Sequence, residues 1–185
     1  MSTEAKNTFL VFSFILMFSF IFFACTDDEQ EIQSIYFGNA EATRNGEAYL
    51  SDVRSQYSST DGNKILITFD RFEGNVLRTQ LSFININPFE KAFQFILPDT
   101  ALTCERNYAN FFTGFGDSIS DIYFASLEDT LEDWIVIDSF NTQTAEFWGR
   151  FQISFVRDER FGGVDIFADT LRFENGIFNG RVLER

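Results

Sequence analysis

The stretch AEFWGRFQISFV, Ala145 to Val156, alternates in the manner of a β-strand. Successive side chains of a strand point to opposite faces, so a period of two indicates a strand with one face in a core. One face carries the large apolar residues Phe147, Phe151, Ile153 and Phe155. Trp148 and Arg150 lie on the other face. The stretch therefore predicts a strand that buries an aromatic side.

Three further runs predict strands: KILITFDRF (Lys64 to Phe72), LRTQLSFINI (Leu77 to Ile86) and WIVIDSF (Trp134 to Phe140). The first places Ile65, Ile67 and Phe69 on one face. The second places Leu77, Thr79, Leu81 and Phe83 on one face before its alternation drifts. The third is rich in β-branched and aromatic residues, which strands favour.

Residue pairs that accept a positive φ separate such runs. Asn-Gly and Asp-Gly are the strongest short hairpin signals. They occur at Asn45-Gly46, Asp61-Gly62, Asn175-Gly176 and Asn179-Gly180. Gly74-Asn75 and Gly162-Gly163 indicate two looser turns.

Short strands at this spacing predict an all-β fold, a single antiparallel β-sandwich or β-barrel of about ten strands. We expect at most one short helix, within Pro98 to Phe112, where Asp99 is a candidate N-cap. A chain of 185 residues fits one domain of this kind.

Composition excludes several classes of function. The chain has 28 acidic and 14 basic residues, a net charge of -14, whereas nucleic-acid binding depends on clustered Lys and Arg. It has no histidine, which excludes Ser-His-Asp and Cys-His catalysis and histidine-based zinc sites. We predict no nucleic-acid partner, no cofactor and no metal.

The N-terminal run FLVFSFILMFSFIFF, Phe9 to Phe23, contains fifteen uncharged residues. A membrane-spanning helix needs about 20 apolar residues, whereas the core of a signal peptide needs only about 7 to 15. Ala24 is a small residue of the type found before a cleavage point. We expect a signal peptide over residues 1–24, an acidic tether over 25–33 and the all-β domain over 34–185.

The sequence FFAC, Phe22 to Cys25, resembles the lipobox of a bacterial lipoprotein, and the TDDEQE that follows resembles an acidic export tract of Bacteroidota lipoproteins. The resemblance implies that Cys25 carries acyl chains. It also implies that the protein is exported and anchored by lipid in the outer membrane, facing the cell surface. The alternatives are an uncleaved N-terminal anchor and a disulfide between Cys25 and Cys104.

The sequence WIVIDSFNTQTAEFWGRFQISFV, followed by DTLRFENGIFNGRVLE, resembles the C-terminal half of small uncharacterised Bacteroidota lipoprotein domains. The matching residues are Gly149 to Phe151 and Asn175 to Phe178, the latter in a closing hairpin. RNGEAYLSD, Arg44 to Asp52, is similar to a hairpin near the start of those domains. The resemblance implies a β-rich domain on a lipid anchor, without an established activity.

The segment NYANFFTGFG, Asn107 to Gly116, has the composition of a loop and carries the candidate ligand-binding residues Tyr108, Phe111, Phe112 and Phe115. Aromatic rings beside amide groups can hold a glycan, a peptide or a protein segment. The alternative is that these rings cover one end of a barrel, because exposed apolar patches are rare.

Other polar clusters favour structural interpretations. Glu128, Asp129, Glu132 and Asp133 predict a solvated loop. Ser59 to Asn63 and Asp129 to Trp134 have oxygens that suit calcium but lack the spacing of an EF-hand. Cys104, without a histidine base, is interpreted as a small buried apolar residue.

The sequence thus favours a cell-envelope lipoprotein whose β domain is a binding or accessory module, not an enzyme. Two alternatives stay open: a carboxylate-based glycan hydrolase, and a lipocalin-like carrier with an apolar ligand inside a barrel. The sequence names no catalytic residue and no particular ligand.

Overall fold

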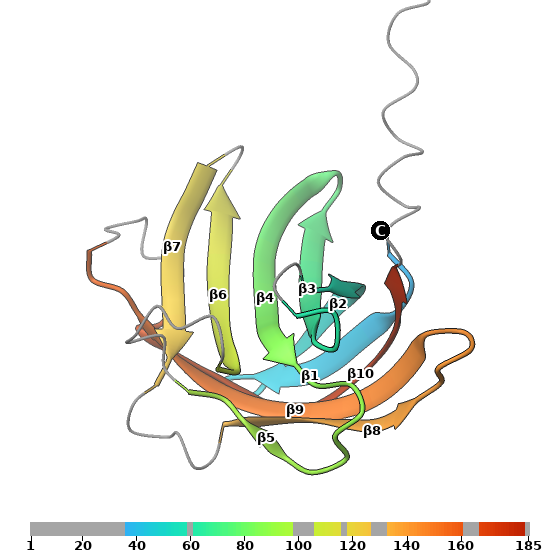
Figure 1. The fold of residues 1–185 in the computed structure, drawn as a ribbon. Coiled ribbons are helices and arrows are strands. Elements are labelled where there is room, and N and C mark those ends of the chain that lie inside the picture. The colour runs from blue at the N-terminus through green and yellow to red at the C-terminus, as the bar shows by residue number, and fades with distance from the viewer. Residues whose placement is uncertain are drawn as a thin grey trace, which may run out of the picture. The chain divides into compact units, whose positions relative to one another are not determined.

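A computed structural model describes residues 36–58, 61–97, 106–115, 118–126, 133–160 and 167–183, and these residues form ten strands (Figure 1). In chain order the strands are β1 (Asn39–Arg44), β2 (Glu47–Tyr57), β3 (Ile65–Glu73), β4 (Val76–Ile86), β5 (Gln94–Phe95), β6 (Tyr108–Phe115), β7 (Ser118–Ala125), β8 (Trp134–Phe140), β9 (Glu146–Arg157) and β10 (Thr170–Leu183). The four runs predicted as strands correspond to β3, β4, β8 and β9.

Eight of the strands form a closed barrel. Each pairs with the next in the order β1, β2, β3, β4, β6, β7, β9 and β10, and β10 pairs back with β1. All these pairings are antiparallel. β10 also makes a short parallel pairing with β2, beyond the N-terminal end of β1. The predicted all-β antiparallel class is confirmed, its form is a barrel, and the described residues contain no helix.

The two remaining strands extend the sheet from β9. β7 pairs only with the C-terminal end of β9, at β9 residues 155–157. β8 pairs with the same edge of β9 at β9 residues 147–152. β5 then pairs with β8 and forms the last strand of this extension, below the barrel in Figure 1.

Aromatic side chains pack tightly inside the barrel. One group consists of Phe69, Phe83, Phe151 and Phe178, whose ring centroids lie 5.1 to 6.1 Å apart. A second group consists of Phe111, Tyr123, Phe155 and Phe173, whose centroids lie 5.4 to 6.0 Å apart. Each buried phenylalanine stabilises the fold by about 1.5 to 3 kcal/mol relative to an exposed one. These groups are therefore the core of the domain.

Glycines on β9 and β10 make room for inward-facing rings, two of which belong to the first group. Phe147 pairs with Gly180, Gly149 with Phe178, and Phe151 with Gly176, all on the inner face. A Cβ at Gly176 would lie 2.4 Å from the Phe151 ring, and a Cβ at Gly180 would lie 2.6 Å from the Phe147 ring. We call these three pairs the Phe–Gly ladder.

The ladder explains why two predicted hairpins are wrong. Asn175-Gly176 and Asn179-Gly180 both lie within β10, which continues through them. Asn175 does have a positive φ of 54°, but it marks a bulge in β10 rather than a reversal of the chain. At both positions a ring from β9 occupies the space that a side chain would need, so glycine is required.

The other described turns follow the prediction. Asn45 and Gly46, with φ of 49° and 83°, join β1 to β2 in a two-residue hairpin. A turn at Asp61-Gly62 leads into β3, and Gly74, with φ of 61°, lies in the turn between β3 and β4. Gly162-Gly163 and the proposed helix cap Asp99 lie outside the described residues, and 106–112 is not helical.

A buried carboxylate holds the start of the described chain against the outside of the barrel. Asp70 is fully buried although it points away from the core. It accepts hydrogen bonds from the Tyr36 hydroxyl at 2.8 Å and the Gln80 amide at 2.6 Å, and it lies 3.1 Å from Arg54 Nη2. Burial, together with the Asp70 charge, raises the pKa of Tyr36 above its usual value.

Candidate functional site

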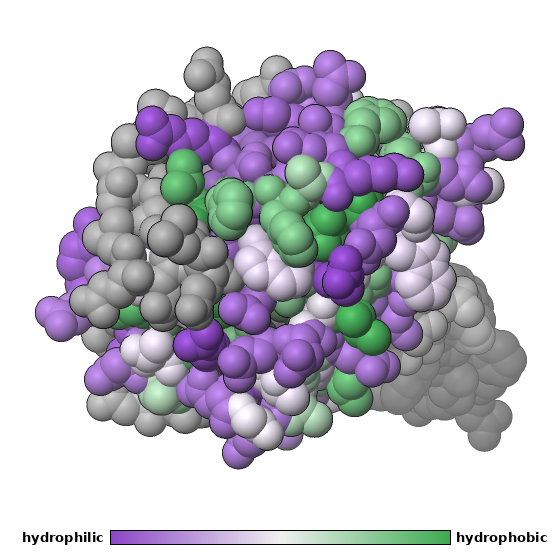
Figure 2. Space-filling view, turned by 90° about the horizontal axis from the view of Figure 1, so that it is seen from below, coloured by the Kyte–Doolittle hydropathy of each residue, from purple (hydrophilic) through white to green (hydrophobic). Residues whose placement is uncertain are grey.

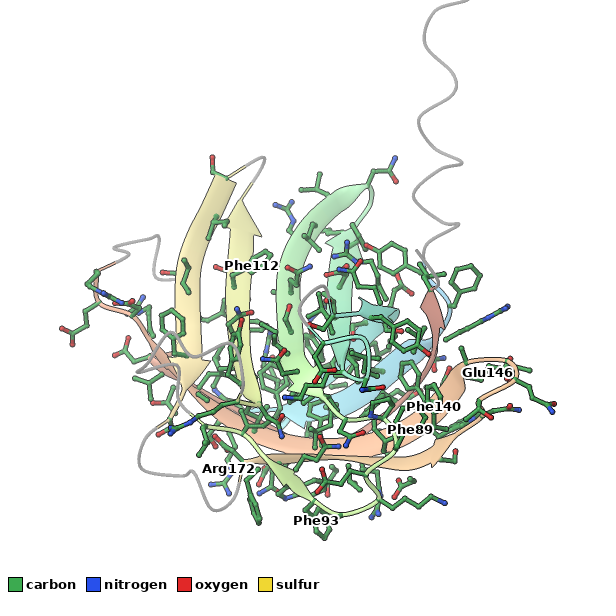
Figure 3. The ribbon with its side chains drawn as sticks, viewed as in Figure 1. Phe89, Phe93, Phe112, Phe140, Glu146 and Arg172 are labelled. Carbon is green, nitrogen blue, oxygen red and sulfur yellow. The ribbon has the colours of Figure 1, made fainter. Side chains whose placement is uncertain are left out.

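The four aromatic residues predicted as a loop platform lie on a regular strand, β6, so the loop interpretation is wrong. Phe111 points into the second aromatic group and is fully buried. Phe112 and Tyr108 are half-buried, and Phe112 lines a depression with Leu77 and Ile119 on the outside of the barrel (Figure 3). The Phe115 side chain lies outside the described residues. Phe111 belongs to the core and cannot contact a ligand.

Most other predicted positions lie outside the described residues, namely Cys25, Cys104, Glu128, Asp129 and Glu132. Asp133 is described, and the expectation that it is solvated is wrong. Its Oδ1 accepts a hydrogen bond of 2.8 Å from the Ser154 amide, so it supports the sheet. Within the described ranges, no cluster of three or more His, Cys, Asp or Glu residues is arranged to hold a metal.

A cavity of about 470 Å³ lies at one rim of the barrel. Because the strands alternate in direction, the ends of β1, β3 and β6 meet the starts of β4 and β10 at this rim. We call it the mouth cavity; its lining consists of Arg44, Arg71, Phe72, Glu73, Arg78, Thr79, Thr113, Gly114 and Phe167. Its volume falls in the usual range for small-ligand sites, about 300 to 1,000 Å³.

Arg44 is the most deeply placed charge in this lining. It follows Ala40 and Ala42 on the inner face of β1, and only 9% of it is exposed. Its guanidinium carbon lies 4.4 Å from the ring centre of Phe167 and 5.7 Å from that of Tyr49, in cation–π contact. Its Nη1 is buried and has no hydrogen-bond partner among the described residues.

The charges around Arg44 leave the cavity electropositive. Arg78 forms an ion pair with Glu73 at 2.9 Å, which neutralises both. Arg44 and Arg71 have no carboxylate partner in the described part of the chain. Burial, the largest cause, lowers the pKa of Arg44 and the neighbouring Arg71 charge acts in the same direction, whereas Tyr49 and the Glu47 carboxylate act in the opposite direction.

Hydroxyl groups border the arginines. The Tyr49 hydroxyl lies 3.4 Å from the Thr79 hydroxyl, and burial raises the pKa of Tyr49 to about 12, so it is neutral at physiological pH. The Thr113 hydroxyl donates to the buried Asp121 at 3.3 Å, and Arg157 lies 3.8 Å from the same carboxylate. Asp121 is thus engaged by its own neighbours at the edge of the site.

A second depression, of about 440 Å³, lies on the outer face of β1, β8, β9 and β10. It carries Trp148, which is 60% exposed. Its polar groups already bind one another, since Arg150 forms two hydrogen bonds of 2.8 Å with Asp138 and Asn179 donates to Asn39. The mouth cavity, with its unpaired arginines, is the stronger candidate.

Further exposed aromatic rings lie around β5, on the side of the domain seen in Figure 2, where apolar side chains are bordered by hydrophilic ones. Phe89 packs edge to face on Phe140 at 5.2 Å, and Phe93 does so on Trp134 at 4.8 Å (Figure 3). These contacts hold the β5 segment against β8, so the rings have a structural role.

The sequence analysis did not identify Arg44 as a site residue. A usable signal was present, because alternation extended back from the Asn45-Gly46 turn assigns Arg44 to the same face as Ala40 and Ala42. A charged residue on an inward face is either paired or functional.

Comparison of the chain with protein-family models, with curated protein sequences and with solved structures finds no match. In the part of the chain that the structure describes, no helix is long and apolar enough to cross a bilayer.

Proposed function

We propose that this protein is a non-enzymatic binding module of the cell envelope, and that it recognises its ligand at the mouth cavity. The observation that carries the proposal is the contrast between a core of closely packed rings and a rim cavity that contains a buried, unpaired arginine. Rings in mutual contact favour recognition at the rim over the alternative of a lipocalin-like carrier.

The surroundings of the buried carboxylates favour binding over catalysis. Asp70 is held by Arg54, and Asp133 by a backbone amide. Glu73, the carboxylate in the described lining of the mouth cavity, is paired with Arg78. A carboxylate-based hydrolase requires an acid of raised pKa beside an ionised partner, whereas these groups have ordinary structural partners.

We place the module on the outer face of the outer membrane, anchored through lipid on Cys25. The proposal rests on the FFAC sequence and the acidic tract after it, and on the resemblance to Bacteroidota lipoproteins. Several acyl chains on one cysteine give stable anchoring, because each buried methylene contributes about 0.8 kcal/mol.

Hydrogen exchange followed by mass spectrometry tests the binding function. The protein is incubated separately with neutral glycan fragments, short neutral peptides and small organic acids. A true ligand is expected to slow exchange in peptides that cover the β1–β2 and β3–β4 turns, with β5 and β8 as internal controls. Protection by none of these probes at the rim, or protection confined to other surfaces, contradicts the proposal.

Intact mass and membrane fractionation test the anchor. Wild-type protein is expected to gain the mass of the lipid and to partition with membranes, whereas Cys25→Ser is expected to do neither. Cys104→Ser is the matched control, because it removes the other cysteine and is expected to behave as wild type. Identical behaviour of wild type and Cys25→Ser refutes the lipoprotein assignment.

A further inference from the structure

We propose that the mouth cavity binds an oxyanion, a carboxylate, sulfate or phosphate group of a small ligand, and that Arg44 is its principal contact. The inference rests on the proposed function, because it names the ligand chemistry of the same cavity. It adds a charge class and a contact residue that the binding function alone does not specify.

The Arg44 side chain carries a buried donor without a hydrogen-bond partner among the described residues. A buried polar atom without a partner destabilises a fold, and an arginine has no neutral form at physiological pH. Nη1 of Arg44 is such an atom, and the two aromatic rings beside the guanidinium cannot accept its hydrogen bond in the way an oxygen does. Arg44 also lines the cavity, so an oxyanion bound there compensates the buried charge of its guanidinium.

The charge of the cavity lining and the shape of its guanidinium groups both suit an anion. The lining has three arginines and one glutamate, a net charge of +2, in a chain whose net charge is -14. Arg71 is exposed at the rim and Arg44 is buried beneath it, so an anion that enters meets one guanidinium at the surface and a second inside. Guanidinium groups donate in a planar fork that matches the oxygens of carboxylates and phosphates.

Two phenylalanine side chains form an apolar part of the cavity lining. Phe167 lies against the guanidinium of Arg44, and Phe72 lines the same cavity. Apolar walls lower the local dielectric constant and so strengthen the attraction between an anion and the arginines. They also suit a ligand in which the oxyanion is attached to a small organic body.

Isothermal titration at constant ionic strength tests the inference, with sodium phosphate, sodium sulfate and sodium acetate as probes and sodium chloride as the reference. At least one oxyanion is expected to bind wild-type protein. Arg44→Gln is expected to weaken that binding about ten- to hundredfold, the effect of losing charge-assisted hydrogen bonds. Arg71→Gln, at an exposed position that the core does not need, is expected to weaken it as well.

Arg181→Gln is the matched control, because it removes the same charge from the other end of β10 and is expected to leave affinity unchanged. A response to acetate alone assigns a carboxylate, and a response to phosphate or sulfate alone assigns a tetrahedral anion; either supports the inference. Absence of binding by all three anions, or equal binding by wild type and both cavity variants, overturns it. If neutral probes still protect the rim from exchange in that case, the proposed function stands and only the oxyanion assignment fails.

Discussion

Substitution of Gly176 by alanine tests whether the Phe–Gly ladder sets the packing of the barrel. An ideal Cβ at this position would lie 2.4, 2.5 and 2.6 Å from three ring carbons of Phe151. Carbon atoms in contact prefer about 3.5 to 4.0 Å, so the ring must retreat by roughly 1 Å. The backbone at Gly176 lies outside the left-handed region, so the added methyl group tests packing alone.

The Phe151 ring has little room to retreat. Its centroid lies 5.1 Å from that of Phe69 and 5.3 Å from that of Phe83. Overpacking of a filled core destabilises by about 1 to 3 kcal/mol. In a domain of about 150 residues each kcal/mol lowers the melting temperature by roughly 2 to 4 °C, so we expect a fall of about 2 to 12 °C. Thermal and urea unfolding followed by circular dichroism measure it.

A double-mutant cycle identifies the cause. Phe151→Ala alone should destabilise by about 3 to 5 kcal/mol. In that background the ring is absent, so Gly176→Ala should have almost no further effect, and the coupling free energy should equal the effect of Gly176→Ala alone. Gly62→Ala is the control, because its added Cβ meets nothing within 4 Å. Additive effects of the two ladder substitutions refute the reasoning.

Three further predictions concern side chains around the core. Phe111→Ser should destabilise the domain by about 3 to 5 kcal/mol, whereas Phe112→Ser, at a half-buried outward position, should have a clearly smaller effect in urea unfolding; equal effects would contradict the assignment of faces on β6. Asp70→Asn should lower the free energy of unfolding by about 2 kcal/mol, because it removes the charge of a fully buried carboxylate that contacts Arg54 and Tyr36. An unchanged urea midpoint would show that these contacts contribute nothing. Tyr49 has a pKa of about 12 in the folded state because of burial, above the value of about 10 in an unfolded chain. The contribution of the neutral Tyr49 hydroxyl to the free energy of unfolding is fully present below pH 10 and falls by about 1.4 kcal/mol per pH unit between pH 10 and 12. In Tyr49→Phe the free energy of unfolding should therefore decline less steeply as the pH rises through this range.

The fold was largely predictable from the sequence because periodicity of two is a local property. The strands β3 and β9 correspond closely to runs predicted from alternation, and β8 corresponds to the run predicted from its β-branched and aromatic residues. The hairpin at Asn45-Gly46 was predictable for the same reason, because a two-residue turn depends only on the φ values of its own residues.

The two wrong hairpins show where local signals fail. Asn175-Gly176 and Asn45-Gly46 have the same chemistry, yet only the second reverses the chain. The difference is the Phe151 ring, which comes from another strand and occupies the space beside Gly176. A glycine can serve a turn or a close approach by a neighbour, and the sequence does not distinguish these uses before the strand pairing is known.

The candidate site was missed for a related reason. Aromatic residues mixed with Asn and Gly predicted a loop at Tyr108 to Phe115, but the pairing of β6 with both β4 and β7 makes this segment a central strand. The burial of Arg44 likewise depends on strand pairing, because β1 is enclosed between β2 and β10. Both outcomes follow from closure of the barrel, which is a non-local event.

The contrast between an acidic chain and a positive rim cavity has a consequence for selectivity. At physiological ionic strength the Debye length is about 8 Å, so the net charge of -14 repels extended polyanions that approach the surface, such as nucleic acids. Arg44 and Arg71 both line the cavity, and the charge of the buried Arg44 is screened less than that of the exposed Arg71. A single oxyanion on a small ligand can reach both guanidinium groups without placing further negative charge against the acidic surface. If the oxyanion assignment holds, raising the salt concentration should therefore weaken binding of a small anion to the buried Arg44 only modestly, because ions in solution screen a buried contact much less than an exposed one.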